Sequence, residues 1–510
     1  MLRDNGIIIL FDFLLSEKNN GETKPFGNRG YSALYTIGFT LGGQAFRPDE
    51  SAVLYTNIRA EIERYLTDSV VAPLLDASLV GLPMIQKFSK AWGDAKTMTR
   101  WIAMLFHHVD TGYVSNSNSA TLSGLGMSLF RKIGFFQTCD RVRSGVLDLI
   151  DQERYGAAVD EAEIRNCVEV FKVMGSCSPK ACHELKDVPT LLKQTIDLSI
   201  YHEHFEASFL ARTTAFYKAK AESWREEPVS NYLKLVERAL ASEKARADRY
   251  LHASTERPLR LATVAVLLSE PQQELVNRPA SGMRTMLECD REDDLKRMYA
   301  ASAKLTASAS HARCLPRTCT FTLPYLFSGP FGNVLRRYML FTQEGVAGQE
   351  GPLIEVFENF VLAEGMKIID SRRVEVAAIE ANGKKESAAD GHKTVVDLLA
   401  LHAKAQGMLM GLFRRNHNFS KAIASSFFNF VNADASEKVS NVELLVAYLD
   451  GVLKGKEGTL KLDERAVEER LDGAMRLFQY VNRLSILGQD TFAWSMRPHL
   501  LTCSLLVAPD

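Results

Sequence analysis

The side chains best suited to chemistry are histidines and cysteines that stand in short clusters. His202 and His204 flank Glu203 in the stretch IYHEHFEASFLARTTAFYKAKAESW, which begins at Ile200. Helical residues two positions apart point about 200° away from each other, so these two imidazoles cannot bind one metal ion. Two further clusters separate their cysteines by four residues, a gap that is loose for zinc: Cys177 with Cys182 and His183, and Cys314 with Cys319 and His311. The spacing predicts surface histidines and no metal site.

Common signatures of catalysis and of nucleotide binding are absent from the sequence. The sequence contains no G-x-S-x-G, G-x-x-x-x-G-K-[ST], H-E-x-x-H or G-x-G-x-x-G motif. The glycines of SGLGM, which begins at Ser123, favour a joint between helices over a phosphate-binding loop. We therefore predict no active site and no cofactor.

Composition indicates a globular protein of several packed units, with 510 residues, 46% hydrophobic and 24% charged. The 61 basic and 62 acidic residues nearly cancel, so no overall field attracts nucleic acid or an anionic membrane. No apolar stretch approaches the length of about 20 residues that spans a bilayer. Eight cysteines without a C-x-x-C pair are typical of a reducing compartment, here the cytoplasm or nucleus. Neither nucleic acid nor membrane is expected as a partner.

Apolar residues recur at intervals of three and four along most of the chain, as in LYTNIRAEIERYLTDSVVAPLL, which begins at Leu54. This period predicts helices, and the alternation typical of strands is nearly absent. We expect the helices to be interrupted at Pro48, Pro73, Gly156, Gly175 to Pro179, Pro228, Pro258 and Gly351-Pro352. Such an all-α chain either closes into a bundle or stacks as a solenoid. Because the sequence contains no identical internal repeat, the apolar period does not distinguish between these two folds.

An aromatic stripe at Tyr201, Phe205 and Phe209 begins a longer pattern. The stretch YHEHFEASFL is similar to the Y-x-x-x-F-E-x-x-F-L helix of cullins. The stretch VSNYLKLVERALASEKARADRYLHASTE, which begins at Val229, resembles the run that follows in that family. Ordered similarity continues from about Leu34 to Leu501, with an interruption near Cys314. On this resemblance the chain is identified as a member of the cullin family.

The resemblance implies a fold and its subdivision. Cullins are elongated all-α solenoids of three five-helix repeats, followed here by the start of a helical bundle. The implied segments are a divergent N-terminal helix and loop (1–30), repeat 1 (31–154), repeat 2 (155–290), repeat 3 with an insertion at about 313–351 (291–440), and part of a four-helix bundle region (441–510).

The resemblance also implies a function. Cullins are scaffolds of multisubunit ubiquitin ligases without an active site of their own, and they hold a substrate adaptor at the N-terminal end of the solenoid. The stretches KNNG and YSALYTIGF look most like the Cullin-3-like subclass, which binds BTB-domain adaptors; a Skp1-type adaptor stays open. Carried over by position, the adaptor-binding residues are Tyr31, Leu34, Tyr35 and Phe39 on one helix, and His108 and Asp110 on a second helix, RWIAMLFHHVDTGYV. The spacing of the first four permits a single helical face.

The given sequence stops where the family continues into an α/β domain that binds a RING-box protein and a winged helix modified by the ubiquitin-like protein NEDD8. We therefore expect an incomplete ligase scaffold in which recruitment of the RING-box protein is doubtful. The alternative is a helical-repeat tether unrelated to ubiquitin.

Overall fold

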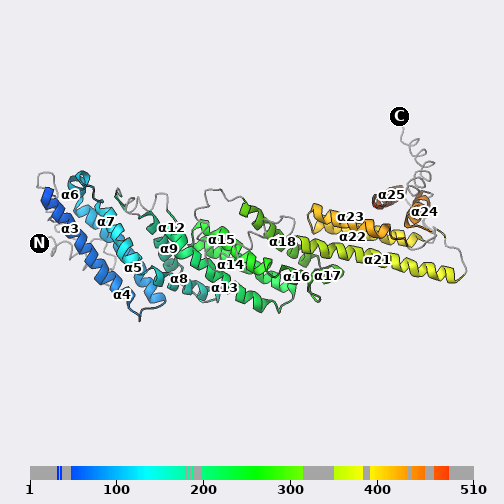
Figure 1. Cartoon of the computed structure of the whole chain (residues 1–510), viewed down its shortest axis with the longest axis horizontal. Coiled ribbons are helices and arrows are strands. Elements are labelled where there is room, and N and C mark those ends of the chain that lie inside the picture. The colour runs from blue at the N-terminus through cyan, green and yellow to red at the C-terminus, as the bar shows by residue number, and fades with distance from the viewer. Residues whose placement is uncertain are drawn as a thin grey trace, which may run out of the picture. The chain divides into compact units, whose positions relative to one another are not determined.

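The computed structural model describes residues 31–33, 35–36, 39, 48–177, 182–183, 185, 187, 197–313, 350–382, 387, 391–434, 439–453 and 464–481. Across these residues the chain forms helices and no strand, which confirms the all-α prediction (Figure 1). It divides into two compact units. Unit 1 comprises Met1–Ala219, Arg238–Thr263 and Arg317–Arg336; unit 2 comprises Lys220–Glu237, Val264–Pro316 and Arg337–Asp510. The predicted repeat boundaries stay predictions.

The helices of unit 1 come mostly from the first half of the chain. They are α3 (Pro48–Tyr65), η2 (Leu66–Val71), α4 (Ala72–Leu75), α5 (Leu82–Leu105), α6 (His107–Val109), η3 (Asp110–Val114), α7 (Leu122–Leu129), η4 (Phe130–Phe135), α8 (Cys139–Arg154), α9 (Glu161–Ser176), α12 (Ser199–Tyr201), η5 (His202–Glu206), most of α13 (Ala207–Trp224), the second half of α14 (Val229–Tyr250) and α15 (Ala253–Val264). The η segments are π-helical turns. Helix α5 packs against α7, α8 and α9.

Polar side chains fix where several helices begin. Thr121 precedes α7, and its hydroxyl accepts the N–H of Gly124 at 3.1 Å. Asp160 precedes α9, and its carboxylate accepts the N–H of Ala162 at 3.0 Å. Such caps satisfy backbone donors that the first helical turn leaves unpaired.

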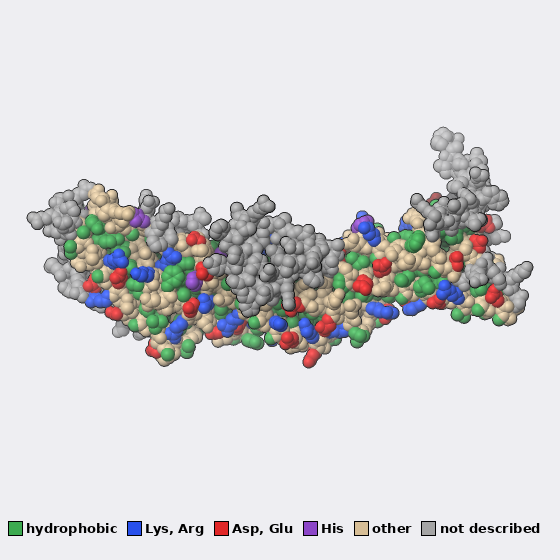
Figure 2. Space-filling model, in the orientation of Figure 1, with side chains coloured by type: hydrophobic (Ala, Val, Ile, Leu, Met, Phe, Trp, Pro, Cys, Tyr) green, Lys and Arg blue, Asp and Glu red, His purple; other side chains and the backbone are tan. Residues whose placement is uncertain are grey.

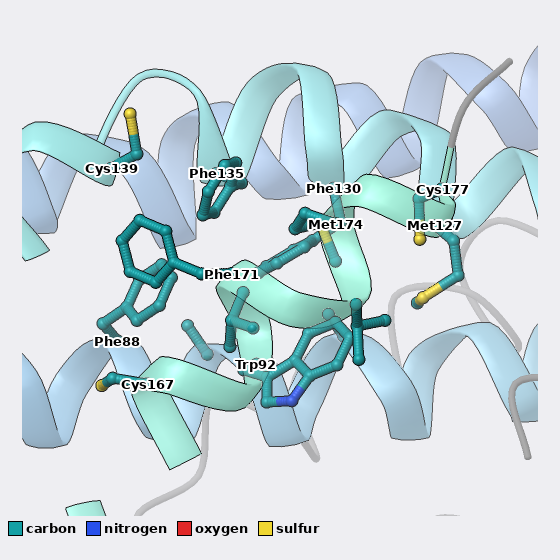
Figure 3. Close-up of a cluster of buried hydrophobic side chains, with 14 of the residues drawn as sticks. Phe88, Trp92, Met127, Phe130, Phe135, Cys139, Cys167, Phe171, Met174 and Cys177 are labelled. Atoms are coloured by element: carbon teal, nitrogen blue, oxygen red, sulfur yellow. The ribbon is translucent and has the colours of Figure 1, made fainter. Parts of the chain in front are cut away.

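The aromatic stripe belongs to the core of unit 1. Tyr201, Phe205 and Phe209 are buried, and the last two rings lie parallel with centroids 6.1 Å apart. Phe205 also contacts Phe171, at 5.4 Å between centroids. Figure 3 shows Phe171 within the same buried cluster as Phe88 and other rings. Burial of rings this large contributes much of the apolar stabilisation of the unit.

A buried charge network joins three helices of unit 1. The carboxylate of Glu243 on α14 accepts two hydrogen bonds from Arg154 on α8, at 3.1 and 3.2 Å. It also accepts one from Arg246 at 2.5 Å and one from the Tyr217 hydroxyl at 2.7 Å. The side chains of Arg154, Glu243 and Arg246 are between 2% and 6% exposed. Each charge is thus paired where water is excluded.

Unit 2 contains the remaining helices: the end of α13, the first half of α14, η6 (Ala265–Ser269), α16 (Gln272–Asn277), α17 (Met283–Glu288), α18 (Glu292–Arg313), α21 (Gly351–Ala381), α22 (His392–Gly411), α23 (His417–Val431), α24 (Asn441–Leu453) and α25 (Glu464–Phe478). Helices α21 and α23 pack along each other. They meet closely where Gly365 faces the buried ring of Phe430. The rings of Phe413, which follows α22, and Phe419 of α23 stack with centroids 4.0 Å apart.

Most of the predicted interruptions between helices are confirmed. Helix α3 begins at Pro48, α8 ends before Gly156, α9 ends at Ser176, α14 begins after Pro228 and α21 begins at Gly351. Two are wrong. Pro258 lies inside α15, where a proline removes only one hydrogen bond and the buried neighbours Leu259 and Ala262 hold the helix in the core. Pro73 lies in the first turn of α4, directly after a π-helical turn, and the helix ends at Leu75 instead.

The glycines of SGLGM do not form a joint either. They lie inside α7, where a Cβ at Gly124 would stand 1.6 Å from the carbonyl oxygen of Cys182 and one at Gly126 would stand 2.5 Å from Thr99 Oγ1. Gly124 thus admits the backbone of Cys182 close to α7, and Gly126 leaves room for the side chain of Thr99.

Surface charge agrees with the balanced composition. Basic and acidic side chains are interspersed on the face that Figure 2 shows. No helix in the described part of the chain is both long enough and apolar enough to cross a bilayer. The N-terminal segment 1–30, almost all of the insertion at 313–351 and the end of the chain from 482 lie outside the described residues.

Asp94 on α5 gives a pH-dependent prediction. Burial raises the pKa of its carboxyl to about 6, and Lys90 acts against the rise. A folded-state pKa above the unfolded value of about 4 means that the folded chain loses stability as the pH rises from about 4 to about 6. Asp94→Asn removes this loss. We expect it to raise the free energy of unfolding by about 1 kcal/mol above about pH 7, allowing for solvent at this half-buried group, with no gain near pH 4.

Thermal unfolding followed across this pH range measures the effect. Asp68→Asn, at an exposed position in η2, is the matched control and should change little at any pH. An Asp94→Asn gain that does not vary with pH would contradict the assignment.

Candidate protein-docking surface

The second predicted docking helix is interrupted. The stretch RWIAMLFHHVDTGYV was expected to form one helix, but α5 ends at Leu105 and Phe106 leaves the helical region with φ −110° and ψ 27°. The short helix α6 and the π-helical turn η3 follow. The ring of Phe106 is buried, so the kink lies in the core of unit 1. His108 therefore lies on α6 and Asp110 at the start of η3.

Three aromatic residues of the first predicted docking helix gather over this kink. Tyr31, Tyr35 and Phe39 are all helical, and the rings of Tyr31 and Tyr35 stack with centroids 6.1 Å apart. Tyr31 also meets Trp101 of α5 edge-on at 6.1 Å. Leu34, the fourth member of the predicted face, lies outside the described residues.

His108 is the centre of these contacts. Its ring meets Tyr35 at 5.3 Å and Phe39 at 4.6 Å, both edge-on. Its Nε2 lies 3.0 Å from the Tyr35 hydroxyl, a hydrogen bond whose direction depends on the imidazole tautomer. We call Tyr31, Tyr35, Phe39, Trp101 and His108 the aromatic ridge. The structure thus brings together four of the six predicted residues and adds Trp101.

The aromatic ridge is accessible. Phe39 is 56% exposed, and the other four residues are half-buried. Rings held against one another and still open to solvent lose little conformational freedom when a partner covers them. This arrangement suits protein docking rather than chemistry.

Asp110 has a different role from the other predicted residues. Its Oδ1 accepts the N–H of Leu122 at 2.8 Å, at the first residue of α7. Burial raises the pKa of the Asp110 carboxyl, while that hydrogen bond acts in the opposite direction. The contact fixes the turn between η3 and α7. Asp110 therefore positions the kinked segment, and its predicted contact with an adaptor has no geometric support among these contacts.

Trp101 was missed as a site residue. It stands seven positions before His108, a spacing that brings two residues to the same side of a helix, and this signal was present in the sequence. The interruption at Phe106 was not visible, because nothing in the apolar period distinguishes a buried kink from a continuous helix.

The histidine and cysteine clusters do not assemble a metal site in the part of the chain that the structure describes, where no three metal-ligating side chains converge. The side chain of His202 is 35% exposed, and its Nδ1 lies 2.5 Å from the buried carboxylate of Glu206. The ring of His204, also half-buried, contacts Phe136 instead. Cys177 and Cys182 are both buried, whereas Cys314 and Cys319 lie outside the described residues.

Comparison with known proteins decides the family. A family model described as the cullin alpha solenoid domain matches residues 22–314 and 334–492. The chain belongs to the cullin family. The solenoid prediction is confirmed by the same match, and the open choice between a bundle and a solenoid is closed.

Several curated cullins are similar to this cullin chain. Cullin-1 of Oryza sativa subsp. japonica is 27% identical over 479 residues, which cover 92% of this chain and 55% of that protein. Cullin-2 of Arabidopsis thaliana is 25% identical over 471 residues, covering 91% and 54%. Cullin-3A of Arabidopsis thaliana is 23% identical over 451 residues, covering 88% and 49%. The chain spans about half the length of these relatives, and their names do not single out the predicted Cullin-3-like subclass.

Proposed function

We propose that this cullin chain is a non-catalytic scaffold of a cullin-RING ubiquitin ligase, acting in the cytoplasm or nucleus. It binds a BTB-domain substrate adaptor through the aromatic ridge. The observation that carries the proposal is the exposed ring of Phe39, held edge-on against His108. Family membership and the similarity to a relative named Cullin-3A support the choice of partner.

A second candidate partner is a Skp1-type adaptor. We keep this adaptor class in the test because the similarity to relatives named Cullin-1 and Cullin-2 covers 92% and 91% of this chain. The similarity to Cullin-3A covers 88%. A tether unrelated to ubiquitin is the remaining alternative, and it predicts that neither adaptor class binds.

The test is a binding titration with the purified full chain against BTB-domain proteins and Skp1-type proteins. We expect a BTB-domain protein to bind, and the double variant Phe39→Ala/His108→Ala to lose affinity by about 10- to 100-fold. The reason is that truncating both rings removes the exposed anchor and the side chain against which it packs.

The matched control is Tyr155→Ala, which removes another strongly exposed aromatic ring of unit 1, 71% exposed at the end of α8. It should leave the affinity unchanged. Undiminished binding by the double variant would remove the aromatic ridge from the proposal. Binding of Skp1-type proteins alone would replace the partner, and binding of neither class would leave the tether.

A further inference from the structure

Glu206 of η5 has a buried carboxylate that the scaffold function does not use. The residue is 3% exposed, and its Oε2 lies 2.5 Å from Nδ1 of His202. Within the described residues, this is the ion pair that the carboxylate forms. Its other oxygen, Oε1, accepts the hydroxyl of Thr255 on α15 at 2.6 Å. Burying a carboxylate is costly unless it is paired and hydrogen-bonded in this way.

The hydrogen bonds continue from Thr255 to the turn between α14 and α15. Because the Thr255 hydroxyl donates its proton to Glu206, it accepts the hydroxyl of Tyr201 at 2.6 Å. The Tyr201 oxygen in turn accepts the backbone N–H of His252, directly before α15, at 3.4 Å. Tyr201 and Thr255 are fully buried. This chain of hydrogen bonds therefore joins α12 and η5 to the α14–α15 turn inside the core of unit 1.

The histidines at the two ends of the chain are held in different protonation states. An ionised carboxylate only accepts hydrogen bonds, so Nδ1 of His202 carries a proton and the charge of this ring changes at Nε2. Nδ1 of His252 instead accepts the backbone N–H of Ser254 at 3.1 Å, which requires an unprotonated nitrogen. The contacts thus favour the imidazolium at His202 and the neutral ring at His252.

Nearby charges act on the two histidines in the same directions. The hydrogen bond to Glu206 and the negative charges of Glu206 and Asp197 raise the pKa of His202, while burial acts against the rise. Burial and the positive charges of Lys172 and His202 lower the pKa of His252. Lys172 lies on α9, and Asp197 lies just before α12.

Helix α8 also packs against η5. Its Arg143 donates to the backbone carbonyl oxygen of His204 at 3.2 Å and pairs with Asp140 at 3.0 Å. This cation is thus occupied by other acceptors, and His202 remains the counter-charge of Glu206.

We propose that His202 and Glu206 form a pH-sensitive switch that holds η5 against the turn between α14 and α15. While His202 is charged, it compensates the buried carboxylate, which positions Thr255 and, through Tyr201, the turn. The His202 side chain is 35% exposed, so its Nε2 exchanges protons with water. When Nε2 releases its proton, Nδ1 still donates to Glu206, but the buried negative charge has lost its counter-charge. The junction then opens more often.

The junction is expected to be tighter in acid than in alkali. A histidine whose pKa is raised in the folded chain stabilises the closed junction fully below its unfolded pKa of about 6.5, and this stabilisation is lost as the pH rises through the folded-state pKa. Between about pH 5.5 and about pH 9, the equilibrium constant for opening should rise by as many powers of ten as the folded-state pKa exceeds about 6.5. Histidine is the side chain whose charge ordinarily changes near neutral pH.

The test combines two measurements on the full chain. NMR of ¹³C-labelled histidine rings gives the pKa of His202, whose signal is the one missing from His202→Gln. Hydrogen exchange of the amides in residues 199–210 and 251–263, corrected for the intrinsic pH dependence of exchange, gives the opening constant at each pH. We expect the wild-type opening constant to rise by the factor that the pKa implies. His202→Gln keeps a donor but does not titrate, so its opening constant should stay level.

Two further variants serve as controls. His204→Gln should keep the wild-type pH dependence, because the ring of His204 contacts Phe136 rather than a carboxylate. Glu206→Gln should lower the pKa of His202, because burial then acts without the carboxylate. Titrations that all chains share, such as that of Asp94, cancel when each variant is compared with the wild type.

Three results overturn the proposal. The first is a pKa of His202 at or below about 6.5 in the wild-type chain. The second is a wild-type opening constant that does not rise with pH, which is read without any variant and so does not depend on the folding of one. The third is an equal rise in the wild type and in His202→Gln.

Discussion

Replacing Glu243 with alanine is expected to lower the free energy of unfolding of unit 1 by about 3–5 kcal/mol. The carboxylate is shared by Arg154 and Arg246, whose side chains are buried with it, and it also accepts the Tyr217 hydroxyl. Removing it leaves two cations without that compensation in a region that excludes water. The desolvation of those cations, rather than loss of the attraction itself, is the larger part of the expected effect.

Hydrogen exchange of amides in α8 and the second half of α14 is the appropriate measurement, because a chain with two units need not unfold in one step. The matched control is Glu256→Ala on α15, also in unit 1. Its carboxylate is 49% exposed and lies 3.8 Å from Lys244 on α14, so we expect a loss below about 1 kcal/mol. Equal losses for the two variants would contradict the importance of burial.

Gly365→Ala is expected to destabilise unit 2 by about 1–3 kcal/mol, although alanine is the better helix former by about 1 kcal/mol. A Cβ at this position would stand 2.2 Å from Cδ1 and 2.3 Å from Cε1 of Phe430, a ring that is fully buried. The ring cannot move without displacing its own neighbours, so α21 and α23 must separate. Overpacking therefore outweighs the gain in propensity.

Exchange of amides in α21 and α23 measures this change, and two variants sharpen it. Gly407→Ala on α22 adds the same methyl group where no atom lies within 4 Å of the new Cβ, so it should be neutral or stabilising. Phe430→Leu, introduced together with Gly365→Ala, should recover part of the loss because the smaller side chain yields space. An unchanged exchange rate in Gly365→Ala alone would show that α21 and α23 tolerate a wider separation.

The helical class and most breaks were predictable because they depend on local signals. An apolar period of three to four residues specifies a helix, and Pro48 and Pro228 lie where the chain must leave or enter one. The interruption at Pro258 was predicted wrongly, because the burial of Leu259 and Ala262 in the core outweighs the local cost of a proline inside a helix. The kink at Phe106, whose ring is buried, carries no local signal in the apolar period either.

The docking residues were predictable only in part. Tyr31, Tyr35 and Phe39 were found by position and spacing, but their edge-on contacts with His108 required the path of the chain after Phe106. The role of Asp110 was hidden for a related reason, because its partner is a backbone N–H twelve residues away.

The shared carboxylate of Glu243 also bears on how such a chain can diverge. At 23% to 27% identity to the three cullins described above, most positions have changed, and a contact between two side chains can be replaced by two successive substitutions. A carboxylate that serves several donors is harder to replace, because its loss weakens two pairs at once and leaves Arg154 with Asp151 and Arg246 with Glu153 as their remaining carboxylate partners. Arg154, Glu243 and Arg246 should therefore be inherited together or exchanged together for apolar residues.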